Sequence, residues 1–119
     1  MTDSKQKARQ IAEAISEKKG YDIVVMGLEG ISLIADYFVI ASGRTGTQVQ
    51  ALTRNVQEKM AEKGLQELRV EGKNEARWVL LDYSDVVVHI FQEEDRAFYN
   101  LERLWSGADL ERFEETAGV

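Results

Sequence analysis

The sequence RWVLLDYSDVVVHIFQ, residues 77–92, constrains the fold of this chain more than any other stretch. β-branched and aromatic residues fill it except for a polar break at residues 82–85, a pattern that predicts two strands joined by a tight turn. The second strand, residues 86–91, is apolar at nearly every position, as expected for a strand that is covered on both faces. We therefore place this strand inside a sheet and expect the rest of the chain to be built around the hairpin.

The first strand of the hairpin has two different faces, because side chains alternate along a strand. These faces hold Trp78, Leu80 and Asp82 on one side and Val79, Leu81 and Tyr83 on the other. Trp78 begins the strand beside a turn-forming segment, where a large aromatic side chain suits a partner surface as well as a core. One of the two faces is expected to be a contact surface, and the pattern leaves open which one.

Helices are predicted where apolar residues recur at a spacing of three and four. The first follows a cap at Asp3 or Ser4 and ends before Gly20, and the second follows a capping box formed by Thr47 and Gln50. The third begins at the acidic residues 93–95 and places Phe98, Leu101 and Trp105 at core spacing.

Further strands are predicted at residues 22–28, 37–41 and 68–70, the last of them as a sheet edge. Together with the hairpin and the helices, these strands predict an α/β (α+β-like) fold with one mixed five-stranded sheet and flanking helices. A chain of 119 residues suits one domain. We expect this domain to cover residues 1–107 and residues 108–119 to form an acidic, flexible tail.

Composition limits the chemistry that the chain can carry. The sequence has no cysteine and a single histidine, His89, which excludes disulfides, thiolate metal sites and multi-histidine zinc sites. The net charge of −6 repels nucleic-acid phosphate and favours a basic protein as partner, so direct nucleic-acid binding is not expected. No apolar run approaches the roughly 18 residues of a membrane helix, and we expect a cytoplasmic protein without membrane association.

Candidate catalytic residues have stronger structural interpretations. Nucleotidyl transfer needs paired carboxylates on one strand face to hold a metal ion, and the predicted strands carry no such pair. Asp82 and Asp85 stand three apart across a turn, where aspartate ordinarily caps the backbone, and His89 has no evident relay partner. The glycines at residues 43–46 match no phosphate-binding motif. We predict no catalytic residue, metal or cofactor.

Five blocks of the sequence occur together in the order and spacing of one known family. These blocks are DIVVMGL (22–28), ADYFVIASG (35–43), LRVEG (68–72), WVLLDYSDVVVHIF (78–91) and FYNLERLW (98–105). The chain thereby resembles the Iojap family, the bacterial ribosomal silencing factors, from about residue 4 to residue 105. The resemblance implies a domain shaped like nucleotidyltransferases but without their catalytic carboxylates.

The resemblance also implies a function that composition cannot show. Proteins of this family bind the fourteenth protein of the large ribosomal subunit and block docking of the small subunit, which lowers translation when nutrients are scarce. An acidic protein docking on a basic ribosomal protein fits the net charge of −6. The alternative is a nucleotide-handling enzyme of nucleotidyltransferase-like shape, and the missing carboxylate pair argues against it.

Carried over by position, the partner surface of the family centres on the hairpin. It comprises Trp78, Leu80, Leu81, Asp82, Tyr83 and Asp85, with His89 alongside. Where relatives often have glycine before the second aspartate, this chain has Ser84, which leaves the turn type open because serine tolerates positive φ less well. Whether the free protein forms a homodimer through the same apolar surface is also left open.

Overall fold

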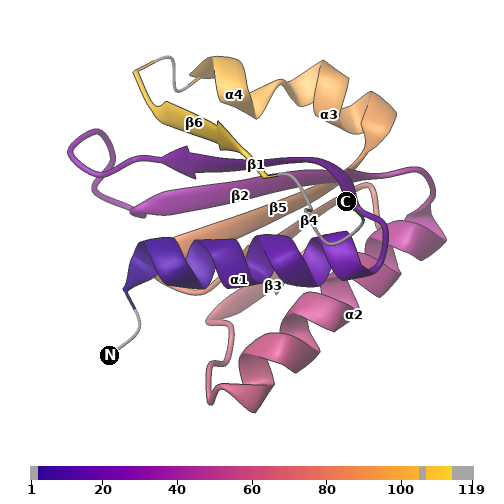
Figure 1. Cartoon of the computed structure of the whole chain (residues 1–119). Helices are drawn as coiled ribbons and strands as arrows, with labels where there is room; N and C mark the ends of the chain where they lie inside the picture. Colours follow the sequence, from indigo (N-terminus) through magenta and orange to yellow (C-terminus); the bar gives the residue numbers. More distant parts are fainter. Residues whose placement is uncertain (1–2, 105–106, 114–119) are drawn as a thin grey trace, which may run out of the picture.

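The computed structural model describes residues 3–104 and 107–113, which form four helices and six strands (Figure 1). These elements are α1 (Ser4–Glu17), β1 (Tyr21–Gly27), β2 (Tyr37–Gly43), α2 (Gly46–Glu62), β3 (Arg69–Glu71), β4 (Trp78–Asp82), β5 (Val86–Gln92), α3 (Glu93–Tyr99), α4 (Leu101–Leu104) and β6 (Asp109–Arg112). The strands form one sheet in the order β3-β4-β5-β2-β1-β6. Only the β2–β5 pair is parallel among these neighbours, so the predicted mixed sheet is confirmed.

The predicted hairpin is confirmed as the antiparallel pair of β4 and β5, with Trp78 opposite Phe91. Three residues connect the strands, and Ser84 among them takes a positive φ of 76°. The Asp82 carboxylate accepts a hydrogen bond of 2.8 Å from the Ser84 backbone N–H, which stabilises this conformation without glycine. Serine therefore occupies the left-handed position of the turn.

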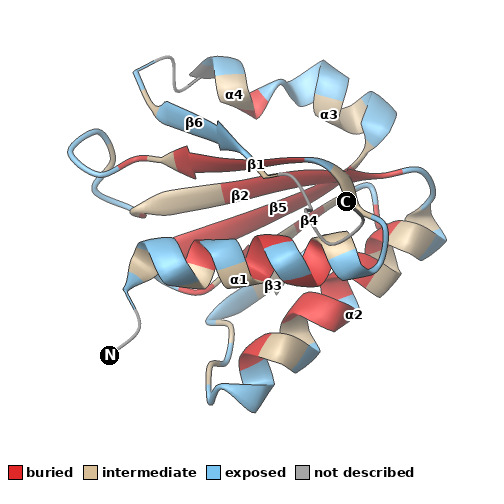
Figure 2. Ribbon diagram, viewed as in Figure 1, coloured by how far each residue is buried: buried red, intermediate tan, exposed pale blue. Residues whose placement is uncertain are grey.

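Helices cover the two faces of the sheet unequally (Figures 1 and 2). The long helices α1 and α2 lie on one face, and the main core between them and the sheet contains fully buried side chains such as Ile11, Leu52 and Ile90. The short helices α3 and α4 lie on the other face, over a smaller cluster that includes Ile40 and Phe91. The second face thus has the thinner cover.

The helix caps agree with prediction at one of two sites. Asp3 caps α1, since its Oδ1 accepts from the Gln6 N–H at 2.7 Å. The cap of α2 is Thr45, whose Oγ1 accepts from the Gln48 N–H at 3.1 Å, so the capping box predicted at Thr47 is wrong. The Thr-x-x-Gln spacing occurs twice in the segment TGTQVQ, and spacing alone does not distinguish the two.

The C-terminal region differs most from prediction. The predicted third helix is interrupted at Asn100, whose φ of 47° is left-handed, and Phe98 is 80% exposed instead of buried. Leu101 is buried as predicted, and Trp105 lies outside the described residues.

The predicted flexible tail is wrong for residues 109–112, which pair with β1 as the sixth strand of a sheet predicted to have five. All four side chains of β6, with sequence DLER, are exposed at the sheet edge, so the strand lacks the apolar alternation that sequence patterns detect. The folded domain therefore extends past residue 107.

Across the described residues, every helix is too short or too polar to cross a bilayer.

The cap assignment makes a direct prediction. Thr45→Ala should lower the free energy of unfolding by about 1 kcal/mol, because it removes the acceptor for an N–H at the start of α2. Thr47→Ala makes the same chemical change two residues later, inside the helix, and should have a much smaller effect. Urea unfolding of both variants distinguishes the two positions, and equal losses would contradict the assignment.

Candidate functional site

The two faces of β4 differ in how far their side chains are buried. Val79 and Leu81 are fully buried and Tyr83 is 4% exposed, all three in the main core with α1 and α2. Trp78 and Leu80 are half-buried on the opposite face. Of the two faces predicted from alternation, the one that carries Trp78 is therefore the candidate contact surface.

We call this surface the open face and define it by one row of side chains on each of three adjacent strands. Its members are Trp78, Leu80 and Asp82 on β4, Val87, His89 and Phe91 on β5, and Phe38 and Ile40 on β2. Three of the apolar members, Trp78, Leu80 and Phe38, are only half-buried. A half-exposed apolar and aromatic surface of this kind is typical of the centre of a protein interface.

Trp78 is held in a fixed position on the open face. Its ring stacks on Phe91 with centroids 5.0 Å apart and lies 4.7 Å from the ring of Tyr99 on α3. Its indole N–H donates a hydrogen bond of 3.0 Å to Nδ1 of His89. Trp78 therefore combines contacts in the smaller core cluster with partial exposure to solvent.

His89 is a packed strand histidine. The side chain is 4% exposed and contacts the ring of Phe38 edge-on at 4.6 Å. Because the indole of Trp78 can only donate, Nδ1 of His89 is the acceptor and the neutral ring carries its proton on Nε2. Burial lowers the pKa of His89 to about 4, so the ring is neutral at physiological pH.

The Nε2 atom of His89 is buried and makes no hydrogen bond with any described residue. A buried donor without an acceptor is uncommon in folded proteins.

Asp85 connects the hairpin turn to the rest of the fold. Its Oδ1 pairs with Lys7 Nζ of α1 at 2.6 Å, and its carbonyl accepts from the N–H groups of Asp36 and Tyr37 at 2.8 and 3.1 Å. The carboxylate of Asp82 is engaged with Ser84 in the same turn. Both acids thus have structural partners, and the described residues contain no group of three or more His, Cys, Asp or Glu side chains suited to a metal ion.

Tyr83 belongs to the opposite face of the hairpin. Its hydroxyl donates to the Glu67 carboxylate at 3.1 Å, and burial together with Glu67 raises the pKa of Tyr83 above its ordinary value. The structure therefore brings together Trp78, Leu80, Asp82 and His89, and it separates Leu81 and Tyr83 from them. These two side chains can serve the open face only by supporting the strand.

Sequence reasoning did not assign Phe38 or Tyr99 to the site. Phe38 joins the open face because β2 pairs in parallel with β5, which places it beside Val87. Tyr99 lies beside the open face because α3 follows β5 directly and brings the Tyr99 ring to 6.3 Å from the ring of Phe91. Both residues lie inside blocks that carry the family resemblance, and that was the only signal for them in the sequence.

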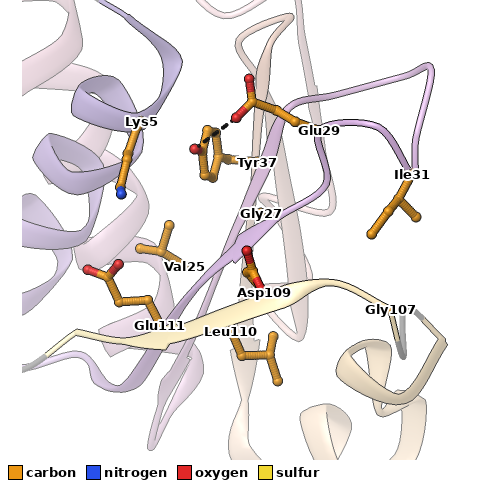
Figure 3. A pocket seen from close by; sticks show the side chains of 10 residues that line it. All are labelled: Lys5, Val25, Gly27, Glu29, Ile31, Tyr37, Gly107, Asp109, Leu110 and Glu111. Carbon is orange, nitrogen blue, oxygen red and sulfur yellow. Dashed lines mark hydrogen bonds between the residues drawn. The ribbon is translucent and has the colours of Figure 1, made fainter.

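A hollow of about 500 Å3 lies elsewhere, between α1, the start of β2 and the edge strand β6 (Figure 3). Lys5, Glu29, Asp109 and Glu111 contribute its charged groups. Two of the carboxylates are engaged. Glu29 accepts a hydrogen bond from the Tyr37 hydroxyl at 3.1 Å, and Glu111 forms an ion pair of 2.8 Å with Arg9 of α1. This hollow is separate from the open face and presents no catalytic arrangement.

Comparisons with known proteins agree with the sequence resemblance. The family model described as "Ribosomal silencing factor during starvation" matches residues 1–118. The ribosomal silencing factor RsfS of Bacillus subtilis (strain 168) is 48% identical over 99 residues, which cover 83% of this chain and 84% of that protein. The chloroplastic protein Iojap of Zea mays is 34% identical over 101 residues, which cover 85% of this chain and 44% of that protein.

Two solved structures share the fold. A crystal structure from Bacillus halodurans has a TM-score of 0.82 and 37% sequence identity, and it covers 92% of this chain and 100% of that chain. An X-ray structure of a protein from Chromobacterium violaceum has a TM-score of 0.86 and 30% identity, and it covers 98% of this chain and 97% of that chain. The likeness extends over nearly the whole length of each protein.

The buried histidine predicts a pH dependence of stability. Because the pKa of His89 falls from 6.5 to about 4 on folding, the unfolded chain binds a proton that the folded protein excludes between these values. The free energy of unfolding should therefore decrease as pH falls through this window, by up to about 3 kcal/mol, and this loss should be absent above pH 6.5.

His89→Gln provides the control, because an amide oxygen can still accept from the Trp78 indole but does not titrate. Urea unfolding of both proteins between pH 7.5 and 4.5 should give a steeper pH dependence for the natural chain. Carboxylates contribute equally to the two curves, so parallel curves would show that His89 is not the titrating group.

Proposed function

This chain belongs to the family of ribosomal silencing factors, and we propose that it represses translation by binding the large ribosomal subunit. In this proposal its partner is the fourteenth protein of that subunit, and the bound protein keeps the small subunit from docking. The action is steric and needs no catalytic residue. The same proposal places the protein in the cytoplasm, where ribosomes work.

The observation that supports this function is the open face around Trp78. Interfaces are dominated by a few aromatic and aliphatic side chains that lose their remaining contact with water on binding. Trp78, Leu80 and Phe38 are half-buried side chains of this type, and they lie side by side on adjacent strands. The net charge of −6 adds attraction toward a basic ribosomal protein and favours fast association.

The open face also suggests how the free protein could self-associate. A second copy would cover the same half-exposed apolar side chains that we assign to the ribosomal protein. We include this homodimer in the proposal as a competing state, so self-association and ribosome binding should exclude each other.

A nucleotide-handling activity receives no support from a specific observation. The two acids of the turn, Asp82 and Asp85, are engaged by a backbone N–H and by Lys7. The similar proteins are named as silencing factors, which describes regulators and not enzymes.

The test uses Leu80 because its replacement disturbs the fold less than replacement of Trp78, which would remove contacts with Phe91 and Tyr99. Leu80→Glu should lower the affinity for purified large subunits at least about tenfold, since docking would bury an unpaired carboxylate. Ala61→Glu is the matched control, because it makes the same change of charge at an exposed position on α2.

Binding is measured by cosedimentation with large subunits, and subunit joining by light scattering after small subunits are added. The natural chain and Ala61→Glu should bind and slow joining, and Leu80→Glu should do neither while its melting temperature stays near that of the natural chain. If Leu80→Glu binds large subunits as well as the natural chain does, the open face is not the binding surface. If small subunits still join large subunits that are saturated with the natural chain, the steric mechanism is wrong.

A further inference from the structure

A second hollow, also of about 500 Å3, lies beside the open face where α3 passes the start of β4. It is lined by Arg77, Trp78, Glu94, Asp95, Phe98 and Tyr99. We propose that this hollow receives one basic side chain, lysine or arginine, from the docked ribosomal protein. The assignment of the partner rests on the function proposed above, whereas the preference for a cation rests on the hollow itself.

The aromatic residues of the hollow form a continuous group. Tyr99 lies 4.7 Å from Trp78 and meets Phe98 edge to face at 5.1 Å, with the two rings at 90°. Phe98 is 80% exposed, although phenylalanine is usually well buried, and Tyr99 is 46% exposed. The negative faces of such rings attract a cation that comes within about 6 Å of the ring centroid.

The carboxylates give the hollow a negative balance. Asp95 is paired with Arg77 at 3.4 Å, and this arginine side chain is 65% exposed. Glu94 is exposed, and its carboxylate makes no hydrogen bond or ion pair with the residues that the structure describes. Two acids against one arginine leave the lining with one net negative charge, which favours a cationic occupant and disfavours phosphate or carboxylate groups.

The position of the hollow connects it to the open face. Trp78 lines the hollow and also belongs to the open face through its stacking on Phe91. A protein that docks on Leu80 and Phe38 therefore passes close to the hollow, and a long basic side chain can place its charge there while its methylene groups pack on the rings. A cation buried between aromatic rings and an unpaired acid binds strongly, because its attraction to the rings and to the carboxylate increases when water is excluded.

A purely structural explanation of the same acids makes a different prediction. Glu94 and Asp95 lie in the first turn of α3, where negative charge stabilises a helix by interaction with its dipole. If this were their whole role, Glu94→Gln would reduce stability slightly and would change no binding. The experiment therefore has to measure binding of a cation directly.

The probe is N-acetyl-L-arginine methylamide, and its uncharged analogue N-acetyl-L-citrulline methylamide has nearly the same shape. Each is titrated into the full-length chain carrying 15N-labelled tryptophan while the indole N–H of Trp78 is followed by NMR. The arginine compound should shift this resonance in a saturable way, and the citrulline compound should not. Glu94→Gln and Phe98→Ala should each weaken the arginine titration at least about threefold. Glu58→Gln, the same change at an exposed position on α2, should leave it unaltered.

The same variants are then tested for cosedimentation with large subunits. Weaker binding by Glu94→Gln and Phe98→Ala, with Glu58→Gln unaffected, supports the proposed source of the side chain. Equal shifts with the arginine and citrulline compounds overturn the cation site, and this result leaves the proposed function untouched because Leu80→Glu tests that separately. An arginine-specific shift together with unchanged large-subunit binding overturns the assignment of the side chain to the ribosomal protein.

Discussion

The burial of β5 on both faces is the constraint on which the other features depend. Val86, Val88 and Ile90 complete the core under α1 and α2, while Val87, His89 and Phe91 form the middle of the opposite face. Each large apolar side chain of this kind contributes about 1.5 to 3 kcal/mol when buried, and a small domain has only about 5 to 15 kcal/mol of net stability. A register shift of one residue would move His89 into the aliphatic core, so the two faces cannot exchange.

The hydrogen bond between Trp78 and His89 links the buried strand β5 to a partly exposed side chain on β4. Desolvation of the imidazole is costly, and the indole N–H offsets part of that cost by satisfying Nδ1. The same bond, with the stacking on Phe91, fixes the indole of the neighbouring strand at the margin of the open face. A rigid tryptophan loses little conformational entropy on binding, so in the complex that we propose His89 would support recognition by holding Trp78 in place.

The sequence was sufficient for elements defined by apolar periodicity and insufficient where orientation depended on other elements. Alternation separated Trp78 and Leu80 from Leu81 and Tyr83, but only the packing of α1 and α2 decides which pair is buried. The resemblance identified the hairpin block as a whole and therefore included both faces. β6 was missed because its pairing with β1 satisfies backbone groups while all four side chains remain exposed. Phe98 was misplaced because helical spacing assumes an unbroken helix, which the left-handed Asn100 ends.

The interruption at Asn100 also explains why the second face stays partly open. The long helices α1 and α2, of 14 and 17 residues, cover the first face of the sheet. On the second face, α3 has only seven residues and α4 only four. Tyr99 reaches Trp78 and Phe91 at one end of the hairpin, and Leu80, further along β4, remains half-buried. Leaving apolar area in water forgoes about 25 cal/mol for each Å2, which a docked partner can recover. The incomplete cover thus costs the free protein stability and leaves that free energy available for association.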